Sequence, residues 1–329
     1  MNPDHHILAG STVTVPALGV GTWAWGDRST WGMGGYDTEL TRDTIREAWE
    51  ASIDSGVTLF DTAEVYGGGE SERILGSLLA SDPGRAASVV VATKFMPSPW
   101  KLQVRSALLR SLRASLERLG LSSVGLYQLH GPISLRSHAV LADALADAHG
   151  AGLVEAVGVS NYSVRETRSM AAALESRGMR LATNQIEYSL LRRSPETGGL
   201  LATCQELGVL PLAYSPIGQG RLTGKYSATN PPPGKRTFSN HPMEVVDQVV
   251  DELRSIGEKH GGKLPSQVAL NWVMVKGAVP IPGAKNRHQA QENAGALGWS
   301  IDDDEDLDRL DRVALGGIRT VQSRLWQHG

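Results

Sequence analysis

Short apolar segments alternate with longer amphipathic segments along this chain, at a spacing of roughly 30 residues, the usual length of a strand–helix–strand unit. The apolar segments are rich in Val, Leu and Ile and lie at Leu18–Thr22, Val57–Phe60, Val89–Thr93, Val124–Leu129, Val154–Val159, Ala182–Glu187, Val209–Tyr214 and Ala278–Ile281. Such runs are typical of strands buried on both faces of a parallel sheet. These eight segments exceed the roughly five or six strands of a common doubly wound sheet. The alternation therefore predicts an α/β fold, a (β/α)8 TIM barrel.

The segments between the predicted strands place apolar residues three and four positions apart, which indicates amphipathic helices. These helices are expected at Thr38–Ser55, Glu70–Ala80, Lys101–Leu119, Leu135–Ala148, Val164–Glu175, Glu196–Leu207 and Pro265–Lys276. A glycine follows most of them and precedes the next strand, at Gly56, Gly120, Gly152, Gly178 and Gly208. Glycine in that place is typical of a left-handed helix cap.

Three segments are expected to be additions to the barrel. His6–Val15 predicts an N-terminal hairpin, and Asp303–Val313 predicts an extra C-terminal helix. Ser215–His241, after the seventh predicted strand, is rich in Gly and Pro and predicts a long functional loop. Because no linker or low-complexity segment divides the chain, residues 1–329 are expected to form one domain.

Composition excludes several classes of function. The chain is 41% hydrophobic and 20% charged with a net charge of −3, so no global field favours nucleic acid or an anionic membrane. No apolar run reaches the roughly 18 residues of a membrane span, and the first residues do not resemble a signal peptide. The lone Cys204 excludes an intrachain disulfide and a thiolate metal site. We therefore expect no metal, no membrane partner and a cytoplasmic location.

Polar side chains follow three neighbouring predicted strands, where a barrel enzyme has its active site. They are a carboxylate, a phenol, an ammonium and an imidazole: Asp61, Tyr66, Lys94 and His130. Each of them has an ordinary structural interpretation when taken singly, such as a turn cap for Asp61. The four together favour a catalytic set.

This set has a chemical logic for carbonyl reduction, which needs an acid to protonate the developing alkoxide. Tyrosine is a poor acid at its usual pKa of about 10. A neighbouring Lys94 would favour tyrosinate and so make Tyr66 a better acid, while Asp61 would hold Lys94 by an ion pair. His130 could then donate a hydrogen bond to the carbonyl oxygen.

The chain resembles the aldo-keto reductase superfamily over essentially its whole length. The matching motifs, in order, are GTWAWG, FDTAEVYG, VATKF, QLHGP, GVSNYS, NQIEYSLL, AYSPIGQGRLTGKY and IPGAKNRHQAQENAGALG. Together with WGMGGYDTEL and KFMPSPWKL, they look closest to bacterial and plastid-type members, some of which reduce pyridoxal or other small aldehydes.

The resemblance implies a role for each matching position. Tyr66 is the expected general acid, supported by Asp61, Lys94 and His130. Ser160, Asn161 and Gln185 are expected to hold the nicotinamide carboxamide, and Tyr214 is expected to stack on the nicotinamide ring. Thr22 and Trp23 are also expected to bind the cofactor. Those expected along the pyrophosphate are Ser215, Pro216, Ile217, Gly218, Leu222 and Lys225. Those expected at the adenosine phosphate are Gly283, Lys285, Gln289, Glu292 and Asn293.

Two cations favour NADPH over NADH as the cofactor. Lys285 and Arg287 lie beside a helix expected to begin near His288, and a helix N-terminus favours a phosphate. Fixed cations there suit a 2′-phosphate, and Arg236 in the long loop is expected to contribute. The competing interpretation of Lys285 and Arg287 is a solvated helix face.

Several aromatic residues are candidates for the substrate pocket. Trp25, Trp31 and Trp100 are expected near the barrel mouth as flat apolar walls, although Trp25 and Trp31 suit ordinary packing equally well. The tail residues Arg319, Arg324 and Trp326 either close over a substrate or belong to a disordered tail. The segment Gly19–Ala24 fits a loose dinucleotide fingerprint, but no strand ending in an acid follows at the required distance. Its glycines are expected to permit close backbone packing instead.

Two functions remain open. One is an enzyme that reduces a small-molecule aldehyde or ketone, such as a pyridoxal reductase or a natural-product ketoreductase. The other is a nucleotide-sensing regulatory subunit on the same fold, with little turnover. The retained His130 disfavours the second. The sequence leaves open whether the chain forms a homo-oligomer.

Overall fold

A computed structural model describes residues 4–26, 39–233, 241–318 and 325–329. Its main sheet has eight strands that pair in parallel in chain order. The strands are β3 (Gly19–Gly21), β4 (Leu59–Asp61), β5 (Val90–Phe95), β6 (Val124–Leu129), β7 (Val154–Ser160), β8 (Leu181–Glu187), β9 (Leu210–Tyr214) and β10 (Val279–Pro280). The ring is completed where Gly21 bridges to Gly283 and the Gly21 amide donates to the Pro282 carbonyl at 2.9 Å. The predicted (β/α)8 barrel is confirmed.

Glycine is required where the first and last strands meet. A Cβ added to Gly21 would lie 2.9 Å from the carbonyl oxygen of Ile281, and one added to Gly19 would lie 2.9 Å from the Ile281 side chain. Only glycine lets the two backbones approach this closely without a shift. The expectation that these glycines serve packing is confirmed.

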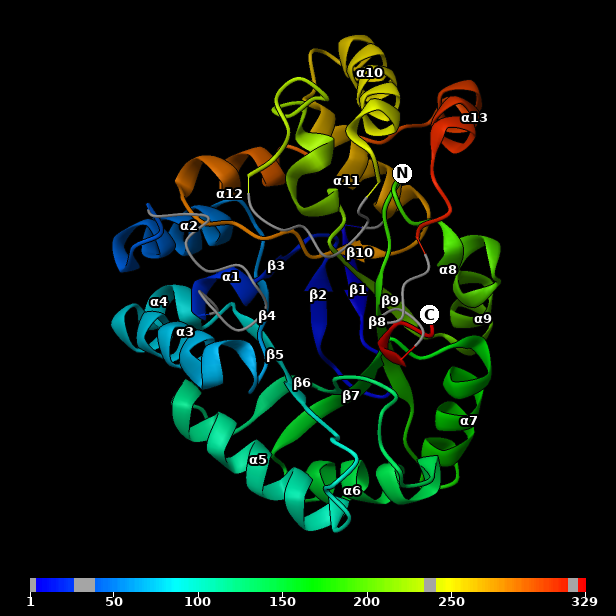
Figure 1. Ribbon diagram of the computed structural model, residues 1–329. Coiled ribbons are helices and arrows are strands. Elements are labelled where there is room, and N and C mark those ends of the chain that lie inside the picture. Colours follow the sequence, from blue (N-terminus) through cyan, green and yellow to red (C-terminus); the bar gives the residue numbers. More distant parts are fainter. Residues whose placement is uncertain (1–3, 27–38, 234–240, 319–324) are drawn as a thin grey trace.

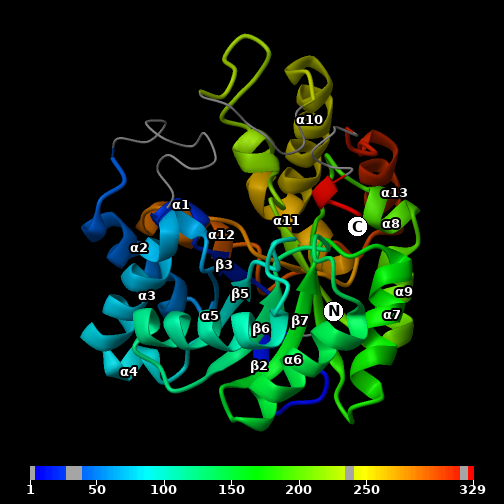
Figure 2. The ribbon, with the colours of Figure 1, turned by 60° about the horizontal axis from the view of Figure 1, so that its bottom comes forward.

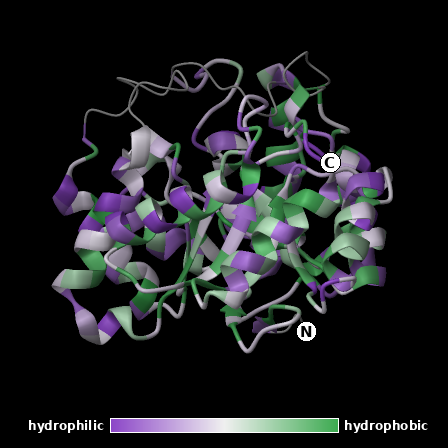
Figure 3. Cartoon of the chain, turned by 90° about the horizontal axis from the view of Figure 1, so that it is seen from below, coloured by the Kyte–Doolittle hydropathy of each residue, from purple (hydrophilic) through white to green (hydrophobic). Residues whose placement is uncertain are grey.

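Helices surround the barrel (Figure 1). They are α2 (Arg42–Asp54), α3 (Glu70–Ser81), α5 (Val104–Leu119), α6 (His138–Gly150), α7 (Val164–Glu175), α9 (Leu200–Leu207), α10 (Met243–Lys259) and α11 (Pro265–Val275). Shorter or peripheral helices are α1 (Trp23–Gly26), η1 (Tyr66–Gly69), α4 (Pro83–Ala86), α8 (Ser194–Thr197), η2 (Gly218–Thr223), α12 (Arg287–Ala294) and α13 (Asp304–Val313). Figure 3 shows that the surrounding helices carry both hydrophilic and hydrophobic residues, as helices packed on a barrel must.

The structure corrects several helix boundaries. Helices α2 and α6 begin later than predicted. Their first residues follow the capping residues Thr41 and Ser137, whose side-chain oxygens accept hydrogen bonds from backbone amides three residues later. The predicted helix Glu196–Leu207 is two helices, α8 and α9, separated at Gly199, whose φ is 79°. The five predicted glycine caps all have φ between 66° and 81°.

Helix α10 was not predicted, although its apolar residues recur with the period of an amphipathic helix. Its buried apolar residues recur at the spacing of one helix face: Val246, Val249, Val250, Leu253 and Ile256. The C-terminal helix was predicted correctly and corresponds to α13. None of the helices in the described ranges is both long enough and apolar enough to cross a membrane.

The predicted hairpin is formed by β1 (His5–Ile7) and β2 (Thr14–Pro16), which pair antiparallel. In Figure 1 both strands lie at the centre of the ring. Figure 2 shows β2 on the opposite side of the barrel from the C-terminus of the chain. Leu8, Val13 and Val15 pack on the apolar residues inside the barrel. The hairpin thus plugs the end of the barrel at which the strands begin.

Candidate active site

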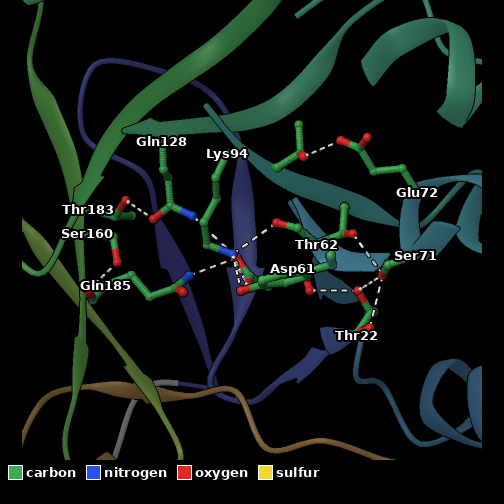
Figure 4. Close-up of polar contacts among 12 residues, drawn as sticks. Thr22, Asp61, Thr62, Ser71, Glu72, Lys94, Gln128, Ser160, Thr183 and Gln185 are labelled. Atoms are coloured by element: carbon green, nitrogen blue, oxygen red, sulfur yellow. Dashed lines mark hydrogen bonds and ion pairs between the residues drawn. The ribbon is translucent and has the colours of Figure 1, made fainter. Parts of the chain in front are cut away.

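The structure brings the four predicted catalytic side chains together at the carboxyl ends of the strands. Asp61 ends β4, Lys94 lies near the end of β5, Tyr66 begins η1, and His130 directly follows β6. The ring centroids of Tyr66 and His130 are 5.6 Å apart in an edge-to-face arrangement. The polar contacts of Asp61 and Lys94 are drawn in Figure 4.

The Lys94 ammonium is fully buried and donates to three acceptors. Its Nζ lies 2.5 Å from Asp61 Oδ2, 2.9 Å from the carbonyl oxygen of Thr62 and 3.2 Å from the Tyr66 hydroxyl. Burial lowers the pKa of Lys94, while the charges of Asp61 and, more weakly, Glu72 oppose that shift. All three ammonium protons therefore have a partner, and one of them points at the phenol.

The Asp61 carboxylate is held on its other oxygen by two amides. Gln185 Nε2 donates to Oδ1 at 2.7 Å and Gln128 Nε2 at 3.3 Å. The side-chain oxygen of Gln128, Oε1, in turn accepts from the Thr183 hydroxyl at 3.1 Å. A buried carboxylate needs such donors, and here they fix the direction in which it presents its charge to Lys94. Gln128 and Thr183 were not predicted as site residues.

A cluster of three buried hydroxyls lies behind this pair (Figure 4). Ser71 Oγ lies 2.7 Å from Thr22 Oγ1 and accepts from Thr62 Oγ1 at 2.9 Å, while Thr22 Oγ1 donates to the Asp61 carbonyl. The side chain of Thr22 is fully buried in this cluster. The Thr22 side chain therefore supports the backbone at Asp61, and its expected contact with a cofactor stays a prediction.

His130 is buried and contacts two aromatic rings: its ring centroid lies 5.6 Å from that of Tyr66 and 5.5 Å from that of Trp326. Burial, and secondarily the Lys94 cation, hold the pKa of His130 well below its usual value. Its Nδ1 makes no hydrogen bond within the described ranges. The imidazole is therefore neutral at physiological pH and keeps one N–H for donation.

The residues expected at the nicotinamide lie together at the ends of β7, β8 and β9. The backbone of Asn161 lies in the left-handed region with φ 63°, and its backbone N–H donates to the backbone carbonyl of Gln185 at 2.8 Å. The same carbonyl accepts from Ser160 Oγ at 2.8 Å, and the Tyr214 hydroxyl donates to Asn161 Oδ1 at 2.9 Å. The strained Asn161 is thus held by its neighbours in one orientation.

The residues expected at the pyrophosphate form a tight turn after β9. Ser215, Gln219 and three glycines of this turn have positive φ, which keeps its backbone compact. Lys225 is exposed at the end of the turn. Leu222 is fully buried in the core, so only its backbone faces the turn. Pro216, Ile217 and Gly218 lie at the start of the turn.

The residues expected at the adenosine phosphate lie just before α12 and along it. Asn286 caps this helix, and the Lys285 amide donates to Gln289 Oε1 at 3.0 Å. Arg287 is half exposed and lies 3.5 Å from Glu50. Two other predicted residues have contacts nearby: Asn293 Nδ2 donates to the carbonyl oxygen of the exposed Gly283, and Glu292 Oε1 lies 3.2 Å from His288 Nε2. Arg236 lies outside the described residues.

The structure does not place the predicted tryptophan walls in a pocket. Trp25 is 2% exposed, donates from its indole nitrogen to the Ala284 carbonyl at 2.7 Å and packs near Phe60, so it belongs to the core. Trp100 is 79% exposed and forms no wall. Trp23 is partly exposed at the start of α1, and Trp31 lies outside the described residues.

Comparison with known proteins agrees with this arrangement. Residues 17–314 match the model of the Aldo/keto reductase family. The chain is 39% identical to the chloroplastic pyridoxal reductase of Arabidopsis thaliana, over 96% of this chain and 87% of the relative. A glycerol dehydrogenase from Gluconobacter oxydans superposes with a TM-score of 0.79 at 27% identity and covers 99% of this chain and 97% of its own.

An aldo-keto reductase from Klebsiella pneumoniae, solved in complex with NADPH, superposes with a TM-score of 0.72 at 26% identity over 93% of each chain. The family match spans most of the chain, and its relatives share the same barrel. The chain therefore belongs to the aldo/keto reductase family.

Proposed function

We propose that the protein reduces an aldehyde or ketone to an alcohol with NADPH, and that Tyr66 supplies the proton. Membership of the family makes the chain an oxidoreductase that acts on carbonyl compounds. The observation that carries the proposal is the position of the Lys94 ammonium, buried between Asp61 at 2.5 Å and the Tyr66 hydroxyl at 3.2 Å.

The groups around the rim follow the same order as the parts of NADPH: nicotinamide, pyrophosphate and adenosine phosphate. Amides and an aromatic ring lie at the end expected to hold the nicotinamide, followed by the compact turn after β9 and then by Lys285 and Arg287 at the start of α12. These cations suit a 2′-phosphate. NADPH, when bound, supplies the hydride that adds to the carbonyl carbon.

The residues of the chain carry out the proton transfer and orient the substrate. Tyr66 gives its hydroxyl proton to the carbonyl oxygen, which becomes the alcohol hydroxyl. Lys94 donates to the phenol oxygen and so stabilises the phenolate that remains. The neutral His130 donates its N–H to the carbonyl oxygen and orients it.

We propose a small aldehyde on a planar aromatic ring, of the pyridoxal type, as the substrate. The Arabidopsis relative is a pyridoxal reductase. The rings of Tyr66 and Trp326 also both lie next to His130, and aromatic walls favour a flat substrate.

NADPH oxidation against a panel of pyridoxal, aromatic, aliphatic and polyketide-like carbonyls tests the proposal. We expect Tyr66→Phe to lower turnover at least about a hundredfold and to leave NADPH binding nearly unchanged. Tyr127→Phe is the matched control, since it removes the same atom from a buried tyrosine on the outside of the barrel. Full activity of Tyr66→Phe would refute the role of Tyr66. Tight NADPH binding without turnover of any carbonyl would favour the nucleotide-sensing subunit.

A further inference from the structure

The last described residues, Leu325–Gly329, lie over the mouth of the barrel, beside the ends of β8 and β9 (Figure 1). We call this segment the C-terminal clasp. Its residues contact the catalytic His130 and several residues that surround the expected nicotinamide site.

Gln327 connects the clasp to the nicotinamide side of the site. Its Nε2 donates to Glu187 Oε2 at 2.5 Å and to the Tyr214 hydroxyl at 2.9 Å. The Tyr214 hydroxyl in turn donates to Asn161 Oδ1 at 2.9 Å. One chain of hydrogen bonds therefore runs from the clasp through the expected stacking residue to the expected carboxamide-binding residue.

The end of the clasp is anchored beyond this chain of hydrogen bonds. The His328 amide donates to the Asn161 carbonyl at 3.1 Å, and its imidazole contacts Glu166 at 3.0 Å. Arg192, which is buried beside Glu187, donates to the backbone oxygen of Gly329 at 2.9 Å. A Cβ at Gly329 would lie 2.9 Å from Leu200, so the last residue fills a close-fitting place.

Trp326 contacts the residues that follow β6. Its ring lies 5.5 Å from that of His130 at an interplanar angle of 62°. A Cβ at Gly131 would come within 2.9 Å of the same ring, so this glycine makes room for it. The clasp thus places an aromatic surface directly beside the residue that orients the carbonyl.

We propose that the C-terminal clasp couples binding of the nicotinamide to closure of the substrate pocket. Tyr214 and Asn161 hold the nicotinamide on one side and the clasp on the other. Fixing their orientation by the cofactor therefore favours the docked clasp, and docking favours nicotinamide binding by the same factor, because linkage is reciprocal. The docked clasp then sets Trp326 as a wall for the substrate. The inference rests on the proposed cofactor site.

Two ligands separate the clasp from the rest of the cofactor site. NADP⁺ carries the nicotinamide, whereas adenosine 2′,5′-bisphosphate occupies only the adenosine end. We expect Gln327→Ala to weaken NADP⁺ about fivefold or more and to leave the bisphosphate unchanged, by calorimetry. Leu325→Ala is the control, because its side chain is 68% exposed in the same segment; both affinities should match the wild type. Equal NADP⁺ affinities for wild type and Gln327→Ala would overturn the coupling.

Hydrogen exchange gives the reciprocal measurement without turnover. NADP⁺ should slow exchange of the peptide that contains the His328 amide, and adenosine 2′,5′-bisphosphate should not. Unchanged exchange with NADP⁺ would also overturn the coupling. A protein that shows the coupling but reduces no carbonyl would lose the proposed reaction and keep the clasp. A protein that does not bind NADP⁺ would lose the proposed cofactor itself.

The wall formed by Trp326 has a separate test in steady-state kinetics. We expect Trp326→Ala to raise the KM of an aromatic aldehyde severalfold with a smaller change in kcat, and Trp326→Phe to restore it. The same KM in all three proteins would refute the wall.

Discussion

The two ends of this barrel are built from the same strands and have opposite chemistry. At the end closed by the hairpin, Leu59, Ala92 and Leu126 form an apolar layer with Leu8 and Val15. Two residues further along the same strands come Asp61, Lys94 and Gln128. Because side chains two residues apart in a strand share a face, these polar residues lie directly above the apolar layer inside the barrel.

The difference between the ends shows where stability and chemistry are separated. At the hairpin end, removal of apolar surface from water stabilises the folded state. The open end buries a charged pair, whose desolvation offsets most of its attraction. The apolar layer therefore stabilises a barrel whose other end holds a lysine and a carboxylate out of water. The following changes, from the largest expected effect to the smallest, test that separation.

Lys94→Met should have the largest effect, because it leaves the Asp61 carboxylate buried without its cation. We expect a loss of about 3–5 kcal/mol in the free energy of unfolding, measured in urea, together with loss of activity. The double variant Lys94→Met/Asp61→Leu should cost less than the sum of the two single variants. Additive costs would show that the two charges do not interact.

Leu8→Ala should weaken the hairpin end and leave the chemistry intact. Removal of this fully buried side chain is expected to cost about 2–5 kcal/mol of unfolding free energy, with kcat of the folded protein unchanged. Ile7→Ala is the neighbouring control, since Ile7 is 71% exposed, and should stay within about 0.5 kcal/mol. A large drop in kcat for Leu8→Ala would show that the two ends are coupled.

His130 should make the open end sensitive to acid. Its pKa is held well below the usual value in the folded state, so the unfolded chain binds a proton first as the pH falls below about 6.5. Stability is therefore lost on acidification, by at most about 1.4 kcal/mol per pH unit. The unfolding free energy of wild type relative to His130→Gln should fall between pH 7.5 and 5, and a constant difference would contradict this.

Tyr127→Phe should have the smallest effect. The Tyr127 hydroxyl is buried and makes no hydrogen bond within the described part of the chain, and burial raises its pKa. Since no bond is lost, the variant should be neutral or more stable by up to about 1 kcal/mol. A clear loss of thermal stability would reveal a partner for this hydroxyl.

The sequence determined the barrel and the order of its chemical groups. Strands and helices follow from short-range periodicity, and the left-handed glycines follow from local backbone geometry. Because parallel strands deliver their ends to one face, Asp61, Lys94 and His130 could be expected to meet. These are properties of neighbouring residues, or of the topology that alternation imposes.

Only the tertiary structure decided which side chains face which surroundings. Trp25 and Trp100 are the same residue type and were both expected near the barrel mouth. Trp25 lies in the core, whereas Trp100 is exposed. Ser71 and Gln327 carry no local signal, because their partners lie far away in sequence, 49 residues in one case and 140 in the other. Burial and hydrogen bonding depend on what packs from other strands and loops, and the pattern of a single segment does not contain that information.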